Sequence, residues 1–106
     1  MHGYTGRLLR ADLTRGRLTV EALAEERARL YIGGSGLAAR ILYDETGPGT
    51  DPLGPENRLV FLTGPLAGTR VPTSSRHAVA ARSPLTGLWG EADSGGSWAA
   101  MLKRAG

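Results

Sequence analysis

The chain has 106 residues, a formal net charge of +3 and no cysteine. This length suits one small domain with a modest core, which we expect to span residues 1–106. The lack of cysteine excludes disulfides, thiolate zinc sites and an iron–sulfur cluster ligated by this chain. No apolar run approaches the roughly 20 residues of a membrane helix. The N-terminus also lacks the pattern of a secretory signal, so we expect a cytoplasmic protein with no membrane partner.

The basic residues are almost all arginine, with Lys103 as the only lysine, and the chain has one asparagine and no glutamine. Scarcity of thermolabile amides suits a thermophile, and a GC-rich genome gives the same bias. The arginines near the N-terminus are interrupted by Asp12 and followed by Glu21. This mixed charge is typical of a solvated strand face, so we expect no nucleic-acid partner.

Two strands joined by a turn are predicted at the start of the chain. Residues 7–13 alternate apolar and polar side chains, as in a half-buried strand, and the apolar face comprises Leu9, Ala11 and Leu13. A glycine-containing turn over 14–16 leads into residues 17–21, which again place their apolar side chains on one face. The pattern predicts a β-hairpin.

Two helices are predicted next, over residues 24–31 and 36–45, separated by Gly33 and Gly34. The first begins with acidic residues, which suit the positive end of the helix dipole. The second has one apolar stripe, formed by Leu37, Ala38, Ile41 and Leu42. On its outer side, the spacing of Arg40 and Asp44 favours an ion pair.

The second half of the chain contains three predicted strands and one helix. The run 59–62 is continuously apolar and predicts a strand buried on both faces. Strands over 76–82 and 88–92 follow a Gly/Pro-rich loop, and a last helix is expected from Gly95 or Gly96 to Arg104. The order ββααβββα indicates an α+β fold. We expect a half-domain with about three helices that is built on a β-rich sheet or is open and barrel-like.

One glycine motif resembles a nucleotide fingerprint. The segment Gly34-Ser35-Gly36-Leu37-Ala38-Ala39 fits G-x-G-x-x-G/A, but that motif requires a preceding strand. Here a helix is expected before it, so a glycine-rich turn between helices is favoured. The only histidines, His2 and His77, have no acidic residue at ligand spacing and are expected to be packed or surface residues.

A second glycine segment has the features of an anion site. Asp93-Ser94-Gly95-Gly96-Ser97 is a polar turn that leads into an Ala-rich helix. Glycine lets backbone N–H groups gather, and a helix N-terminus favours negative charge. The same residues also fit a helix cap without a ligand. Similarly, Arg76 follows three hydroxyl residues and suits either a phosphate or planar heterocycle, or an exposed turn.

These segments form an ordered series along the chain. They are Gly6-Arg7…Asp12-Leu13, Gly33 to Ala38, Asp51-Pro52-Leu53…Glu56-Asn57, Thr63 to Thr69, Pro72-Thr73…Arg76, Ser83 to Gly87 and Ser94-Gly95-Gly96. In this order they resemble the N-terminal domain of the tungsten-containing aldehyde ferredoxin oxidoreductases over essentially the whole chain.

The resemblance implies a tungsten (or molybdenum) bis-pterin cofactor with Mg²⁺. Arg76 matches the family arginine that reaches the pterin, and the segment Asp93, Ser94, Gly95 and Gly96 matches the one that holds pterin phosphate near a bridging magnesium ion. The family has asparagine where this chain has Asp93. A carboxylate beside phosphate repels it unless a cation lies between them or only its backbone carbonyl takes part.

Family members continue for several hundred more residues, which supply cluster cysteines and the substrate channel. This chain alone is therefore expected to bind cofactor without catalytic residues of its own. The complete enzyme would oxidise an aldehyde to a carboxylate with ferredoxin as acceptor. A homodimer or a separately encoded remainder of the enzyme is the expected partner. The alternative is a scaffold or assembly module that has kept the fold and lost the cofactor.

Overall fold

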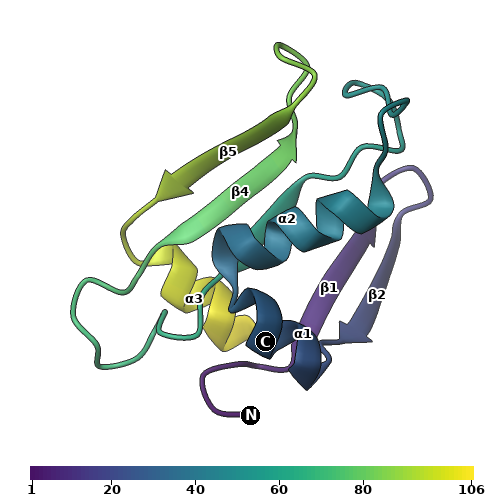
Figure 1. Ribbon diagram of the computed structural model, residues 1–106. Helices are drawn as coiled ribbons and strands as arrows, with labels where there is room; N and C mark the ends of the chain where they lie inside the picture. Colours follow the sequence, from purple (N-terminus) through teal and green to yellow (C-terminus); the bar gives the residue numbers. More distant parts are fainter.

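The computed structural model describes residues 1–106 as three helices and two antiparallel sheets (Figure 1). The elements in chain order are β1 (Arg7–Asp12), β2 (Arg17–Ala22), α1 (Glu25–Tyr31), α2 (Gly34–Glu45), β3 (Val60–Thr63), β4 (His77–Arg82), β5 (Trp89–Ser94) and α3 (Trp98–Ala105). The predicted α+β class and element order are confirmed. The sheets are a β1-β2 hairpin and a three-stranded sheet in the order β3-β4-β5, and neither closes into a barrel. No helix combines the length and apolar character needed to cross a membrane.

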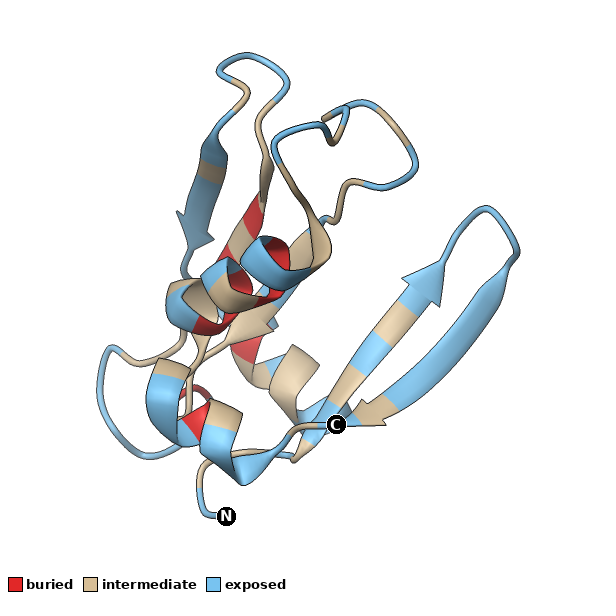
Figure 2. Cartoon of the chain, turned by 45° about the vertical axis from the view of Figure 1, so that its right-hand side comes forward, coloured by how far each residue is buried: buried red, intermediate tan, exposed pale blue.

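Helix α2 covers one face of the three-stranded sheet (Figure 1). Its predicted apolar stripe is confirmed, because Leu37, Ala38, Ile41 and Leu42 are all buried. Ala38 and Leu42 pack with Ala80 of β4, and Val60 and Leu62 of β3 lie against them. Most of the buried residues belong to α2 and β4, and the others lie in α1, in α3 and in the loop that contains Ala67 (Figure 2). The contact between α2 and the sheet forms the main core of the chain.

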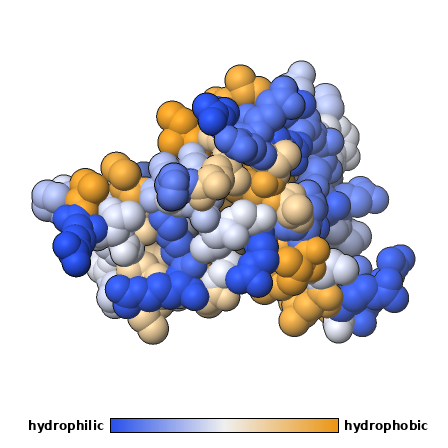
Figure 3. Space-filling view, turned by 90° about the horizontal axis from the view of Figure 1, so that it is seen from below, coloured by the Kyte–Doolittle hydropathy of each residue, from blue (hydrophilic) through white to orange (hydrophobic).

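The core is small. Only 10 of the 106 residues are buried, and six of them are alanines. Several large apolar side chains are instead exposed, and apolar patches lie among the charged groups when the molecule is seen from below (Figure 3). Much apolar surface therefore remains in contact with water.

Strand β3 is half-buried on one face and exposed on the other, so the prediction of a strand buried on both faces is wrong. Val60 and Leu62 contact the α2 core, whereas Leu59 and Phe61 are exposed. Phe61 is partly covered by the Trp98 ring of α3, with ring centroids 5.8 Å apart. The eight-residue helix is too short to cover the rest of that face.

The turn between α1 and α2 confirms the helix–helix interpretation of the glycine motif. Helix α1 precedes the motif directly, and α2 begins at Gly34. A Cβ atom at Gly36 would lie 2.5 Å from the carbonyl oxygen of Tyr31, so glycine is needed for this close approach. The predicted ion pair of Arg40 with Asp44 is also present, and Asp44 binds Arg27 of α1 as well.

The hairpin forms in the predicted place, but its expected burial is wrong. The face that carries Leu9, Ala11 and Leu13 is exposed, and the half-buried residues of β1 are Leu8 and Arg10. Arg10 turns its guanidinium toward the body and pairs with Glu45 at the end of α2. The hairpin stands apart from the rest of the chain with most of its surface exposed (Figure 2).

Candidate functional site

Arg76 and Gly95 flank the same end of the β4–β5 ladder. His77 and Ser94 are the last paired residues at that end. Arg76 immediately precedes His77, and Gly95 immediately follows Ser94, so the antiparallel register brings the two segments together. The two regions that the sequence singled out are therefore neighbours in the fold, 19 positions apart in the chain.

The turn after β5 offers backbone N–H groups. Gly95, Gly96 and Ser97 are exposed, and none of their backbone N–H groups donates to an acceptor within the protein. Helix α3 begins at Trp98, later than predicted, because Gly96 has φ of +95° and cannot belong to a right-handed helix. The Ser97 side chain does not cap the helix. The donors at this turn remain available to an external acceptor.

The charged side chains near this turn are also free of protein partners. Arg76 and Asp93 are both exposed, and neither takes part in an ion pair. Asp93 lies within β5, paired with Ala78, and the Ser94 hydroxyl contacts only the neighbouring Gly95 carbonyl at 3.4 Å. The site thus presents one cation, one carboxylate and several amide donors to solvent.

An aromatic contact that the sequence did not predict supports the site from the other side of the sheet. His77 is buried, and its ring centroid lies 4.3 Å from that of Trp98 at a tilt of 47°. The Nδ1 atom of His77 has no hydrogen-bond partner. His77 is therefore a packed residue, as expected, and it fixes the first turn of α3 against the strand that follows Arg76.

Lys103 connects α3 to the loop that leads to Arg76. Its Nζ atom donates to the carbonyl oxygens of Gly64 and Pro65, at 3.2 and 2.5 Å. Partial burial lowers the pKa of this amine below its ordinary value. Sequence reasoning placed Lys103 only at the C-terminal end of a helix, where it favours the dipole. The contact depends on how the loop folds back, which no local pattern records.

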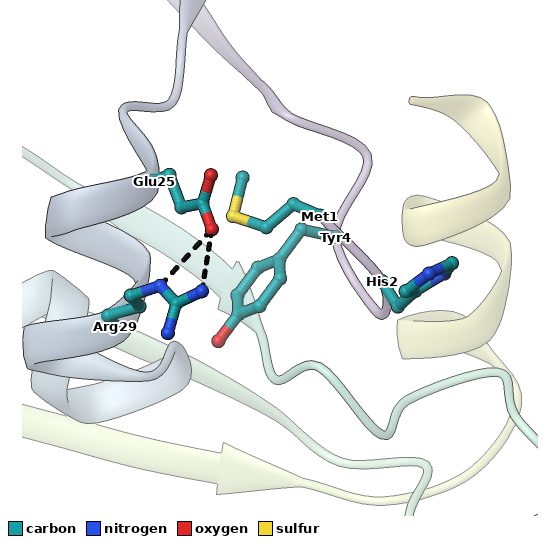
Figure 4. Close-up of a pocket in the computed structure, with 5 residues that line it drawn as sticks. All are labelled: Met1, His2, Tyr4, Glu25 and Arg29. Carbon is teal, nitrogen blue, oxygen red and sulfur yellow. Dashed lines mark hydrogen bonds and ion pairs between the residues drawn. The ribbon is translucent and has the colours of Figure 1, made fainter.

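One hollow of the surface lies away from the turn after β5. It is about 370 Å³ in volume and is lined by Met1, His2, Tyr4, Glu25 and Arg29 (Figure 4). Glu25 and Arg29 pair with each other within α1, and the Tyr4 hydroxyl donates to the carbonyl oxygen of Ala28 at 3.3 Å. No His, Cys, Asp or Glu side chains are grouped in threes that could hold a metal ion anywhere in the chain. This hollow has no arrangement typical of catalysis.

Comparison with known proteins identifies relatives over the full length of the chain. The family model described as the aldehyde ferredoxin oxidoreductase N-terminal domain matches residues 8–106. The tungsten-containing aldehyde ferredoxin oxidoreductase of Thermococcus kodakarensis is 47% identical over 106 residues, all of this chain and 18% of that protein. The corresponding protein of Pyrococcus furiosus is 46% identical over the same span, again 18% of its length. The chain thus spans about a fifth of the length of these relatives.

A solved structure shows the same fold. It is the active site complex BamBC of benzoyl coenzyme A reductase with 1,5 dienoyl-CoA, which matches with a TM-score of 0.96 and 40% identity. The match covers 99% of this chain and 16% of that one. A WOR-like subunit of an aliphatic sulfonate oxidoreductase from Pyrococcus furiosus is 45% identical over 71 residues, 64% of this chain and 11% of that protein. Segments similar to this chain therefore occur in proteins named for different reactions.

Proposed function

Because this chain belongs to the aldehyde ferredoxin oxidoreductase N-terminal domain family, we propose that it binds a tungsten (or molybdenum) bis-pterin cofactor. Arg76 and the segment Asp93, Ser94, Gly95 and Gly96 are the proposed contacts. The observation that carries the proposal is the position of Arg76 and the free N–H groups of Gly95 and Gly96 at one end of the β4–β5 ladder.

The chemistry of these groups fits a phosphorylated heterocycle. Amide N–H groups that converge in a glycine turn bind phosphate oxygens, and the start of α3 adds a partial positive charge. A guanidinium can fork onto a phosphate or stack on a planar ring. Arg76 and the three turn amides are exposed and have no partner within the protein, so a ligand displaces no internal contact.

Asp93 gives the site a requirement of its own. Its carboxylate is exposed two residues before Gly95, and a carboxylate near a phosphate bound at the turn would repel it. A divalent cation between the two would remove that repulsion, and Mg²⁺ prefers such oxygen ligands. We therefore propose that cofactor binding here depends on Mg²⁺, which Asp93 and cofactor phosphate oxygens would hold together.

The chain contributes binding and electrostatics. When bound, the metal of the cofactor supplies the redox chemistry, which in the complete enzyme would convert an aldehyde to a carboxylate. The relatives named for this activity are more than five times as long as the matched region, and this chain has no cysteine for a cluster. A homodimer or a separately encoded remainder of the enzyme is the proposed partner, and ferredoxin would act only on the complete enzyme.

Metal and pterin analysis tests the proposal. The chain is purified from its native host and analysed for tungsten and molybdenum by mass spectrometry, and for released pterin by fluorescence. We expect metal and pterin to copurify, and Arg76→Ala to reduce both more than fivefold. Arg70→Ala is the control, because Arg70 is an exposed arginine in the same loop and lies outside the proposed contacts.

A different result would identify the alternative function. If folded wild-type protein contains neither metal nor pterin, the chain is a scaffold or assembly module that has kept the fold and lost the cofactor. Equal cofactor content in the Arg76→Ala and Arg70→Ala variants would reject the assignment of Arg76 while leaving cofactor binding itself in place.

A further inference from the structure

The turn between β5 and α3 is not held in place by its own N–H groups. The backbone N–H groups of Gly95, Gly96 and Ser97 donate to no acceptor in the protein, and the Ser97 side chain does not cap α3. The two adjacent glycines add backbone freedom, because neither has a Cβ atom that restricts φ and ψ. The positions of these N–H groups are therefore set by the residues that flank the turn.

Both flanks of the turn contact one residue, His77. At the strand end, His77 of β4 is paired in register with Ser94, the last residue of β5. At the helix end, the ring of His77 lies 4.3 Å from that of Trp98, the first residue of α3. His77 also follows Arg76 directly in the chain. A single residue thus connects the arginine with both ends of the turn.

The first turn of α3 is packed on two strands. The ring of Trp98 contacts Phe61 of β3 at a centroid distance of 5.8 Å and His77 of β4 at 4.3 Å. The next residue, Ala99, is fully buried. Ser97 directly precedes this packed pair, so the helix end of the turn is fixed as long as the contact of Trp98 with the strands is closed.

The ring of His77 contributes by packing. His77 is only 9% exposed, and its Nδ1 atom has no hydrogen-bond partner. Buried polar atoms are normally hydrogen-bonded, so this nitrogen gives the fold no advantage over carbon. The contact with Trp98 depends instead on the shape and area of a flat ring. Another aromatic ring should serve at this position, whereas a small side chain should not.

The far end of α3 is held by a different contact. Lys103 donates to the carbonyl oxygens of Gly64 and Pro65. These carbonyls belong to a loop that follows β3, and the contact involves neither β4 nor the turn after β5. The helix therefore has two separate anchors, and only the one at Trp98 borders the proposed site.

We propose that His77 is a positioning residue, which fixes the N–H groups of residues 95–97 relative to Arg76 through its ring contact with Trp98. The role of those N–H groups in binding phosphate rests on the proposed function, but the contact and its effect on the turn do not. Donors that are already ordered bind an anion more tightly than donors that the anion must order. Loss of the ring should therefore weaken binding by the folded chain.

The first measurement needs no ligand. In ¹⁵N relaxation experiments on the free chain, His77→Ala should lower the heteronuclear NOE of the amides of residues 95–97, because the turn loses its anchor. His77→Phe keeps a flat ring and should restore the wild-type values. Trp98→Leu opens the same contact from the helix side while keeping an apolar side chain, and it provides a second variant should His77→Ala not fold.

Lys103→Met is the matched control. It removes the anchor at the far end of α3 and should lower the urea midpoint of unfolding. The amides of residues 95–97 should keep their wild-type NOE values in this variant, because the contact between His77 and Trp98 is left intact. The control thus separates positioning of the turn from a general loss of stability.

Titration with inorganic phosphate measures the consequence for binding. His77→Ala and Trp98→Leu should each weaken phosphate binding at the turn amides by about threefold or more, since the anion must now order its own donors. His77→Phe and Lys103→Met should bind phosphate as wild type does. A residue that served stability alone would lower the urea midpoint without changing the affinity of the folded chain.

The outcomes distinguish this proposal from the proposed function. The positioning role is overturned if the turn of the folded His77→Ala or Trp98→Leu chain is as rigid as wild type, or if Lys103→Met loosens it equally. A His77→Phe chain that behaves like His77→Ala, or a loosened turn that binds phosphate as tightly as wild type, would also overturn it. A wild-type chain that binds no phosphate, with a turn that loosens in His77→Ala, rejects the anion site and supports the positioning role.

Discussion

The Nζ atom of Lys103 on α3 lies 2.5 Å from the carbonyl oxygen of Pro65, and this contact joins the last helix to the loop before Arg76. Replacing Lys103 with methionine keeps the apolar stem and leaves the carbonyls of Gly64 and Pro65 without this donor. We expect the free energy of unfolding to fall by about 1–2 kcal/mol. Urea denaturation measures the change. Arg104→Met, at an exposed neighbour, is the control and should cost only a few tenths of a kcal/mol.

The pH dependence of stability at alkaline pH follows from the same residue. Burial lowers the pKa of Lys103 in the folded chain below its ordinary value of 10.5, so the unfolded chain binds more protons between the two values. The free energy of unfolding should therefore rise with pH through that window, relative to Lys103→Met. NMR of ¹³C-labelled lysine reads the titration directly, because Lys103 is the only lysine. Titration above 10.5 would contradict the prediction.

The stability of the chain at acid pH depends on the contact between Arg10 and Glu21 in the hairpin. A hydrogen bond from Arg10 lowers the pKa of Glu21 below its ordinary 4.5. A lowered carboxyl pKa stabilises the folded chain above the unfolded value, and this stabilisation is lost as pH falls through the folded value. Wild type should lose stability over that range more steeply than Glu21→Gln. Both residues are partly exposed, so the difference should be small and should shrink in high salt. Parallel acid profiles at low salt would reject this role.

The two adjacent glycines of the proposed phosphate turn should respond differently to alanine. Gly96 has φ of +95°, which an L-residue adopts only with strain, whereas Gly95 has no such constraint and a Cβ there would meet no atom within 4 Å. We expect Gly96→Ala to destabilise the chain by about 1–2 kcal/mol and Gly95→Ala to be neutral. Thermal and urea unfolding of the pair provide the measurement. Equal stability of the two variants would show that the turn adopts another backbone conformation.

Local patterns predicted the element order because each element has its own period and is bounded by turn residues. The position of Arg76 and Gly95 at the same end of the β4–β5 ladder also followed from the sequence, since a short turn between two strands leaves little choice but an antiparallel ladder. These features depend on neighbours in the chain. They could therefore be predicted without knowledge of the tertiary arrangement.

Which face of each strand is buried could not be predicted in the same way. Alternation around Leu9 and Val20 shows that an apolar face exists, but the ion pair from Arg10 to Glu45 decides which side meets the body. Likewise, a four-residue apolar run such as that ending at Leu62 does not record whether one or two layers cover it. The contact of His77 with Trp98 depends on the docking of α3. Each missed feature joins segments that are distant in sequence.

Inorganic phosphate should bind the turn after β5, and this provides a direct test of the proposed contacts without the cofactor. The amides of Gly95, Gly96 and Ser97 have no acceptor in the protein, and Arg76 emerges beside them. In ¹⁵N NMR titrations, phosphate should shift these three amides in a saturable manner, and Mg²⁺ should strengthen binding by offsetting the Asp93 carboxylate.

Substitutions of Arg76 and of Asp93 separate the contributions of these two side chains to phosphate binding. Arg76→Ala should weaken phosphate binding severalfold, whereas Arg70→Ala, which removes the same charge from an exposed position in the same loop, should have a smaller effect. Asp93→Asn should strengthen binding without Mg²⁺ and abolish the Mg²⁺ dependence, because it removes the repelling charge and the proposed cation ligand together. Equal, unsaturable shifts in all variants would mean that phosphate acts only through ionic strength and that the turn is a helix start without an anion site.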